Sequence, residues 1–295
     1  MLFQKPITEV IPQRYSCRSY CAEPITAETQ QRMQDFMATL HTGPLGTPLR
    51  FMLFAAAEGD RQSLRGLGTY GFIRGATGFI TGAVGPGDKN LEDFGYQMEA
   101  AVLAATSLGL GTCWLGGSFT QSSFARKIDV TDGEIVPAVT ATGYAVERSL
   151  YSRLVRRQVG ADRRLPRDCL FFLGRFGVPL PAGASGPYVW PLEMLRLAPS
   201  ASNKQPWRII KEGNTWHFYL QRTPKYGRGS LTFALLRLAD LQRVDMGIAM
   251  CHFELTAREL GLDGQWAGMN PGLEIPDERT EYVVSWVESD KIGYN

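Results

Sequence analysis

The feature that most constrains the fold is a helix-like segment that occurs twice. DFGYQMEAAVLAATSLGLG begins at Asp93, and DMGIAMCHFELTARELGLDG begins at Asp245. In each copy apolar residues recur at intervals of three and four, which predicts an α-helix capped at its start by Asp and ended by Gly. The helices are apolar nearly all round, so both should be buried, as at an interface between two halves. One ungapped shift of 152 residues aligns Asp93 with Asp245, Gly95 with Gly247, Leu103 with Leu255, Ala105 with Ala257, Leu108 with Leu260, Gly109 with Gly261 and Leu110 with Leu262.

The segments that flank the two helices also correspond. HTGPLGTPLRFMLF, from His41, resembles PSASNKQPWRIIKE, from Pro199, and strand-like sequence follows each. Another strand candidate follows each helix, near 135–145 and near 281–288. Each half therefore runs helix, strand, helix, strand, which predicts an α+β fold made of two fused homologous halves. The alternative, a coincidence between two Ala- and Leu-rich helices, does not explain the ungapped register and the shared flanking order.

The boundary between the halves is expected near residue 180. The stretch GVPLPAGASGP at this point is rich in the loop formers Pro, Gly and Ser. We therefore expect one half to span 1–180 and the other 181–295.

Composition excludes several classes of protein. A net charge of +2 over 295 residues does not indicate a nucleic-acid-binding protein. The five cysteines are odd in number and scattered, which favours reduced thiols and disfavours a zinc site. The N-terminus lacks the apolar core of a signal peptide, and the most apolar stretch, GFIRGATGFITGAVG, is too short and interrupted to span a bilayer. We expect a cytoplasmic protein with no metal, nucleic-acid or membrane partner.

Two segments of the first half carry groups suited to ligand binding. In RYSCRSY an extended backbone would place Arg14, Ser16 and Arg18 on one side, where two guanidinium groups and a hydroxyl could grip a phosphate. An exposed charged strand is the alternative. In GLGTCWLGG the backbone amides of Gly116 and Gly117 could approach a flat ligand and donate to a ring nitrogen. A helix end followed by a strand is the alternative there.

Two further segments offer polar groups. The basic run SRLVRRQ includes Arg156 and Arg157, which could neutralise a phosphate or form a solvated face. The junction APSASNKQPW, residues 198–207, joins a helical to a strand-like segment and is rich in hydrogen-bonding side chains between two prolines.

Together these segments resemble the nitroreductase family of flavoproteins, which hold FMN between two subunits of a dimer. Residues 14–18 match the family's R-R-S-x-R pattern with Tyr15 in place of the second Arg. Residues 198–207 match its A-P-S-x-x-N-x-Q-P-W loop, and 93–117 match its central helix and G-L-G-T-C-W-L-G-G segment. The Gly143-Tyr144 strand followed by basic residues completes the pattern.

The motifs are divided between the halves. The first half keeps RYSCRSY and the post-helix glycines, while HTGPLGTPLR lacks the Ser and Asn of the loop. The second half keeps the loop but has GPYVWPLEM in place of the Arg-Ser-Arg pattern, and GLDGQWAG after its helix. The resemblance thus implies a monomeric internal pseudo-dimer with a single composite FMN pocket.

The resemblance also implies roles for individual residues. Arg14, Ser16 and one of Arg156 or Arg157 would hold the phosphate and ribityl end, and Arg18 would lie near flavin N1 and O2. Backbone at Gly116 or Gly117 would face N5. The implied cofactor-binding set is Arg14, Tyr15, Ser16, Arg18, Leu115, Gly116, Gly117, Arg156, Arg157, Pro199, Ser200, Ala201 and Asn203.

The chemistry implied is carried by the flavin, with no catalytic side chain required. Hydride would pass from NAD(P)H to N5 and then to a nitroaromatic, a quinone or another small-molecule acceptor. The alternatives are a flavin-binding or storage protein with little turnover and a protein that has lost its flavin. No G-x-G-x-x-G fingerprint follows a strand-like segment, so no Rossmann domain is expected.

Overall fold

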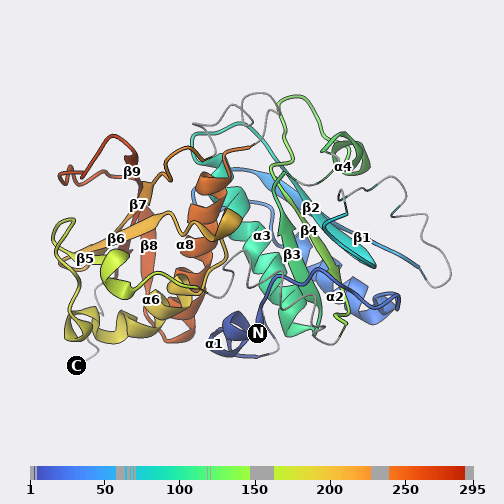
Figure 1. The fold of residues 1–295 in the computed structure, drawn as a ribbon, viewed down its shortest axis with the longest axis horizontal. Helices are drawn as coiled ribbons and strands as arrows, with labels where there is room; N and C mark the ends of the chain where they lie inside the picture. Colours follow the sequence, from blue (N-terminus) through green and yellow to red (C-terminus); the bar gives the residue numbers. More distant parts are fainter. Residues whose placement is uncertain are drawn as a thin grey trace.

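Two long helices lie side by side at the centre of the protein, with one β-sheet on either side (Figure 1). They are α3 (Asn90–Ser107) and α8 (Leu241–Glu259), the two copies of the sequence repeat. The computed structural model describes residues 3, 5–57, 64, 67, 69, 71–117, 119, 121–146, 163–226 and 239–289.

The first sheet has four antiparallel strands in the order β1-β2-β4-β3. They are β1 (Leu49–Ala55), β2 (Gly78–Val84), β3 (Gly111–Leu115) and β4 (Val139–Gly143). All residues of β2 and β4 are buried, because helices or loops cover both faces at the middle of the sheet.

The second sheet repeats this order and adds one strand. Its strands are β6 (Trp207–Glu212), β7 (Thr215–Gln221), β8 (Gly264–Ala267) and β9 (Thr280–Glu288), in the order β6-β7-β9-β8. The corresponding order in the two sheets confirms the prediction of an α+β fold built from two homologous halves.

The additional strand, β5 (Phe171–Leu173), pairs in parallel with β6 at the edge of the second sheet. It precedes the boundary expected near residue 180, so a short piece of the chain before that point completes the sheet of the second half. The boundary itself stays a prediction.

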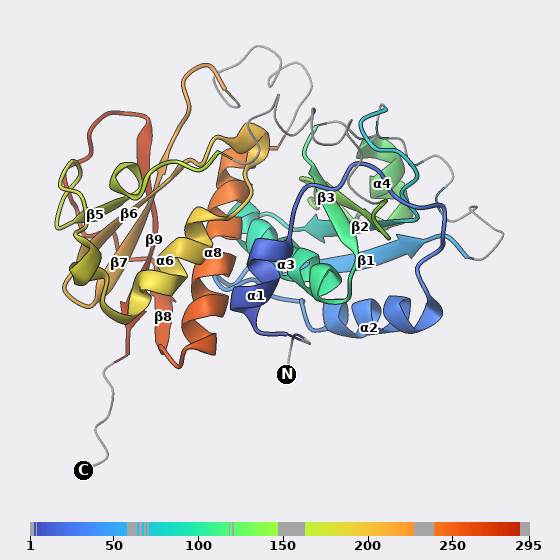
Figure 2. The same cartoon turned by 60° about the horizontal axis from the view of Figure 1, so that its bottom comes forward.

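The smaller helices cover the sheets and the central pair. Figure 2 shows α6 (Val189–Arg196), α1 (Ile7–Gln13) and α2 (Ala27–Ala38) in a row across one face. The side chain of Thr26 caps the start of α2 by accepting from Thr29 N, as hydroxyl side chains commonly do. The short helix α4 (Gln121–Lys127) buries Phe124 on the far side of the first sheet.

The central helices are buried, as their sequences predict, but Asp93 and Asp245 do not cap them. The N-cap positions belong to Lys89 and Asp240. Asp93 and Asp245 lie within the helices and accept hydrogen bonds from backbone of an earlier loop. The predicted caps were therefore wrong, because these side chains serve tertiary contacts rather than their own helix ends.

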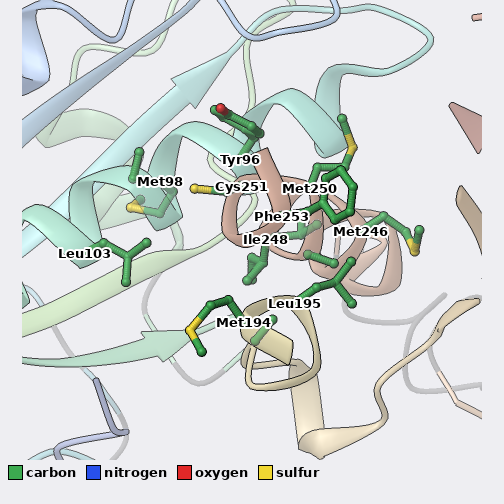
Figure 3. Packing of buried hydrophobic residues seen from close by; sticks show 14 of the residues in the cluster. Tyr96, Met98, Leu103, Met194, Leu195, Met246, Ile248, Met250, Cys251 and Phe253 are labelled. Carbon is green, nitrogen blue, oxygen red and sulfur yellow. The ribbon is translucent and has the colours of Figure 1, made fainter. Parts of the chain in front are cut away.

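Apolar side chains fill the space where α3, α8 and α6 meet. Met98 of α3, Ile248 and Cys251 of α8 and Met194 of α6 are members of one buried cluster (Figure 3). Burying such side chains contributes roughly 1.5–3 kcal/mol each, before the opposing entropy cost. The packing of α6 and α3 on α8 thus joins the two halves through a continuous core.

Candidate functional site

The segment RYSCRSY is extended and lies along the first sheet. Cys17 N donates to Thr112 O at 2.8 Å, and Tyr20 N donates to Arg74 O at 2.9 Å. Ser16 forms an isolated parallel bridge with Thr112, the second residue of β3. These backbone bonds hold the alternating residues of the segment in the extended geometry that the sequence predicts.

Arg14 points into the protein rather than into solvent. Its side chain is only 6% exposed, and its Nε lies 3.8 Å from Oε1 of the fully buried Glu99. Glu99 also accepts from Trp114 Nε1 at 2.7 Å and contacts His252 Nε2 at 2.9 Å. An exposed charged strand therefore does not describe Arg14.

Arg18 presents a buried donor. Its Nη1 is shielded from solvent and has no hydrogen-bond partner in the part of the chain that the structure describes. Burial raises the pKa of the neighbouring Cys113 thiol to about 11, against the opposing effect of the Arg18 charge. A buried guanidinium nitrogen without an acceptor costs free energy, so its geometry suits an acceptor-rich ligand.

The glycines after β3 meet the second half of the chain. Gly116 is half-buried and Gly117 is exposed, so backbone is accessible here. A Cβ on Gly116 would overlap the side chain of Leu241, the first residue of α8. The first-half glycine segment thus lies directly against the start of the second-half helix.

The junction APSASNKQPW is a tight, strained loop. Ala201–Asn203 form a single 3-10 turn, and Ser202, Asn203 and Gln205 have φ values of 50°, 53° and 48°. Left-handed backbone at non-glycine residues costs of order 1 kcal/mol each, and such strain gathers at ligand sites. Ala201 N donates to Asp245 Oδ1 at 2.9 Å, which fastens the turn to α8.

The polar side chains of this loop mainly hold its shape. Asn203 Nδ2 donates to Arg163 O at 2.8 Å, and Gln205 Oε1 accepts from Leu165 N at 2.8 Å. Ser200 Oγ accepts from Gln205 N at 2.9 Å within the loop. The sequence carries no signal for the role of 163–165 as an anchor, because that contact is made only when the chain folds.

The equivalent loop of the first half has a more complete anchor. Asp93 accepts from Leu45 N at 2.7 Å and from Thr47 N at 2.8 Å, one bond to each oxygen. Asp245 has one such bond, and its Oδ2 is buried without a hydrogen-bond partner among the described residues. Burial raises the pKa of Asp245 well above its usual range. An aspartate of a central helix thus holds each loop, but Asp93 accepts two backbone hydrogen bonds and Asp245 accepts one.

Two segments of the expected site, one from each half, contact the same end of α8. Gly116 lies against Leu241, and Ala201 binds Asp245, one helical turn further along α8. The segment 14–18 lies beside the start of β3, where Ser16 bridges Thr112. Arg14 lies beside Glu99, which in turn contacts His252. His252 lies seven residues beyond Asp245, about 10 Å along the helix axis.

Two of the expected site residues have no structural description. Arg156 and Arg157 lie outside the described residues. Across the described ranges, no group of three or more His, Cys, Asp and Glu side chains could hold a metal ion. None of the described helices combines the length and the apolar character that crossing a membrane would need.

Comparison with solved structures finds proteins described as nitroreductases. A protein of Thermotoga maritima described as a putative nitroreductase has 21% identity and a TM-score of 0.59, covering 96% of this chain and 94% of that one. A nitroreductase with bound FMN from Bacteroides fragilis has 21% identity and a TM-score of 0.38, covering 50% and 92%. One from Desulfitobacterium hafniense, also with bound FMN, has 20% identity and a TM-score of 0.39, covering 50% and 92%.

Family comparison covers most of the sequence. A comparison with curated proteins finds no match. The family model described as "Putative TM nitroreductase" matches residues 6–172 and 186–257, which together exceed half of the chain and include the segments described above. The chain therefore belongs to this nitroreductase family.

Proposed function

We propose that the protein is an FMN-dependent NAD(P)H oxidoreductase with one flavin site between its two halves. Its acceptor would be a nitroaromatic, a quinone or another small molecule. The observation that carries the proposal is that Gly116 from the first half and Ala201 from the second half contact Leu241 and Asp245, which are one turn apart near the start of α8. FMN is proposed as the cofactor because the chain belongs to a nitroreductase family and carries its motifs.

The residues present fit a flavin mononucleotide. Arg14 and Arg18 supply guanidinium groups, and Ser16 supplies a hydroxyl, a donor set suited to phosphate and carbonyl oxygens. The buried Nη1 of Arg18 needs an acceptor beyond the described protein groups. We assign Arg18 to the pyrimidine edge, where a fixed cation favours negative charge.

FMN, when bound, supplies the hydride-transfer chemistry. The chain's own part is to bind, orient and shield. Backbone at Leu115, Gly116 and Gly117 offers close approach without side-chain bulk. Pro199, Ser200 and Ala201 form a preorganised cover, because the anchors at Asn203 and Gln205 hold the loop in place before a ligand arrives. Tyr15 and either Arg156 or Arg157 complete the assigned set.

Flavin loading tests the proposal first. The purified protein should be yellow, or should take up FMN and quench its fluorescence. Arg18→Ala should weaken FMN binding by about tenfold or more, and Arg18→Lys should weaken it less, because charge but not the guanidinium geometry is kept. Arg175→Ala, at an exposed arginine beyond β5, is the matched control. A wild-type protein that binds no FMN would refute the proposal.

Turnover separates a reductase from a flavin-storage protein. With FMN bound, NADPH or NADH under anaerobic conditions should bleach the flavin absorbance, and a quinone or nitroaromatic should restore it. A yellow protein that neither donor bleaches would favour storage.

The mass in solution should be that of one chain, since the two halves supply both sides of the proposed site; an obligate dimer would contradict this arrangement.

A further inference from the structure

A buried cluster of charged side chains links Arg14 to the second half of the chain. Glu99 of α3 and His252 of α8 are both 0% exposed, and their Oε1 and Nε2 atoms are 2.9 Å apart. Arg14 Nε lies 3.8 Å from the same Oε1. Trp114 Nε1 donates to the other carboxyl oxygen at 2.7 Å. A buried ion cluster of this kind is costly unless each group is paired.

The hydrogen bonds define how many protons the cluster holds. His252 Nδ1 lies 2.9 Å from Met194 O, a carbonyl that can only accept, so Nδ1 carries a proton. Trp114 can only donate, so Oε2 of Glu99 is an acceptor. One proton therefore lies between Nε2 and Oε1. Whether it resides on His252 or on Glu99, the pair has no net charge.

This proton count has a consequence for Arg14. A carboxylate alone beside Arg14 would cancel the positive charge that an anionic ligand needs. With His252 supplying the shared proton, Glu99 can lie beside the guanidinium without cancelling its charge. We infer that Glu99 and His252 are positioning residues that present Arg14 to the FMN phosphate as a net positive group. This inference rests on the proposed function.

A second buried carboxylate, Glu254 of α8, has a different set of partners. Trp266, which corresponds to Trp114 at the shift of 152 residues, donates to Glu254 Oε2 at 2.6 Å. Tyr96 of α3 donates from its hydroxyl to Glu254 Oε2 at 2.9 Å. Arg258 binds the same carboxylate at 3.0 Å and cancels its charge directly. Among the described residues, the partners of Glu254 thus include an arginine in place of a histidine, whereas the histidine His252 contacts Glu99, the carboxylate near RYSCRSY.

Charge-changing variants test the inference. In His252→Gln the amide can still donate to Glu99 but carries no positive charge. The Glu99 carboxylate should then offset the positive charge of Arg14, so the Kd for FMN should rise about tenfold. Glu99→Gln should bind FMN more tightly than His252→Gln does, because an amide leaves the charge of Arg14 intact. The double variant should recover most of the affinity lost in His252→Gln. Glu254→Gln, in the other cluster, is the matched control and should not change the Kd.

A purely structural role predicts a different pattern. Glu99→Gln would then weaken FMN as much as His252→Gln, the double variant would be the weakest, and the losses would follow the Tm of the apoprotein. Equal FMN affinity of His252→Gln and wild type would also overturn the inference, while leaving the proposed function intact. Failure of the wild type to bind FMN would instead refute the proposed function.

A second variant covers the case in which His252→Gln does not fold, and a second ligand tests whether Arg14 acts on the phosphate. If His252→Gln does not fold, His252→Asn keeps a donor for Met194 O and removes the donor to Glu99, with the same expected loss of FMN affinity. Riboflavin lacks the phosphate, so its affinity should be nearly the same in the wild type and in either variant. An equal loss for riboflavin and FMN would contradict the assignment of Arg14 to the phosphate.

Discussion

Gly95 of α3 lies directly against the backbone carbonyl of Val244 in α8, so closely that a Cβ on Gly95 would overlap it. The reciprocal contact is made by Gly247, whose Cβ would overlap the carbonyl oxygen of Glu92. At the shift of 152 residues Gly95 corresponds to Gly247 and Glu92 corresponds to Val244. The same contact therefore occurs twice, related by the exchange of the two halves, and it sets how closely the central helices approach.

Substituting either glycine should destabilise the whole protein. Gly95→Ala and Gly247→Ala place a methyl group against backbone that cannot move aside as a flexible side chain can, so we expect a loss of about 3 kcal/mol or more. Urea unfolding measures this. Gly268→Ala, at a glycine with no neighbouring atom within 4 Å, should stay within about 1 kcal/mol of the wild type. A tolerated Gly95→Ala would contradict the close crossing.

The two loop anchors should respond differently to the same substitution. In Asp93→Asn the new amide nitrogen would face the N–H of Leu45 or Thr47 and replace an acceptor with a donor. We expect a loss of about 1–3 kcal/mol. In Asp245→Asn the remaining oxygen can still accept from Ala201 N, so the change at neutral pH should be about 1 kcal/mol or less. Equal losses in the two variants would show that the anchors are not distinct.

The pH dependence of stability should report the buried carboxyl of Asp245. Burial raises its folded-state pKa well above that of an unfolded aspartate, about 3.9. The unfolded chain therefore releases this proton first, and the stability associated with the protonated carboxyl is lost as the pH rises from about 4 through the folded-state pKa. The stability of the wild type relative to Asp245→Asn should thus fall from pH 4 to pH 8. A difference that is constant with pH would contradict this.

The contact of Gly116 with α8 can be tested through flavin binding. Gly116→Ala would push against Leu241, a flexible side chain, so the protein should fold while the adjacent backbone shifts. We expect the Kd for FMN to rise about tenfold, the fold-change that corresponds to a modest overpacking cost. Gly268→Ala, at the position related to Gly116 by the repeat, should leave the Kd unchanged. Unchanged affinity in Gly116→Ala would remove this backbone from the site.

The first helix depends on a side chain from the far end of α8. Glu259 accepts from Ile7 N and Thr8 N, while the N-cap residue of α1, Pro6, provides no side-chain cap. Glu259→Ala should cost about 1 kcal/mol, as the loss of a helix cap does, and should speed hydrogen exchange within α1. Glu259→Gln, which keeps one acceptor oxygen, should have a smaller effect. Exchange rates unaffected by Glu259→Ala would show that α1 is held by its apolar face alone.

Much of the architecture follows from local pattern in the sequence. The periodicity of the two repeat helices and the strand-like segments after them are short-range signals, and the structure confirms both. The capping role predicted for Asp93 was wrong, because capping is a local inference and the partner of Asp93 is a loop more than forty residues upstream.

The sequence by itself determined the duplicated halves, the family and the division of the binding motifs between the two copies. These depend on residue order, which repeats and matches without reference to shape. Only the tertiary structure decided that Gly116 and Ala201 both contact the start of α8, that Gln205 binds Leu165, and that Glu99 lies 2.9 Å from His252. Those contacts join residues far apart in the chain. Their geometry is set by the close crossing of the two central helices, which no local pattern encodes.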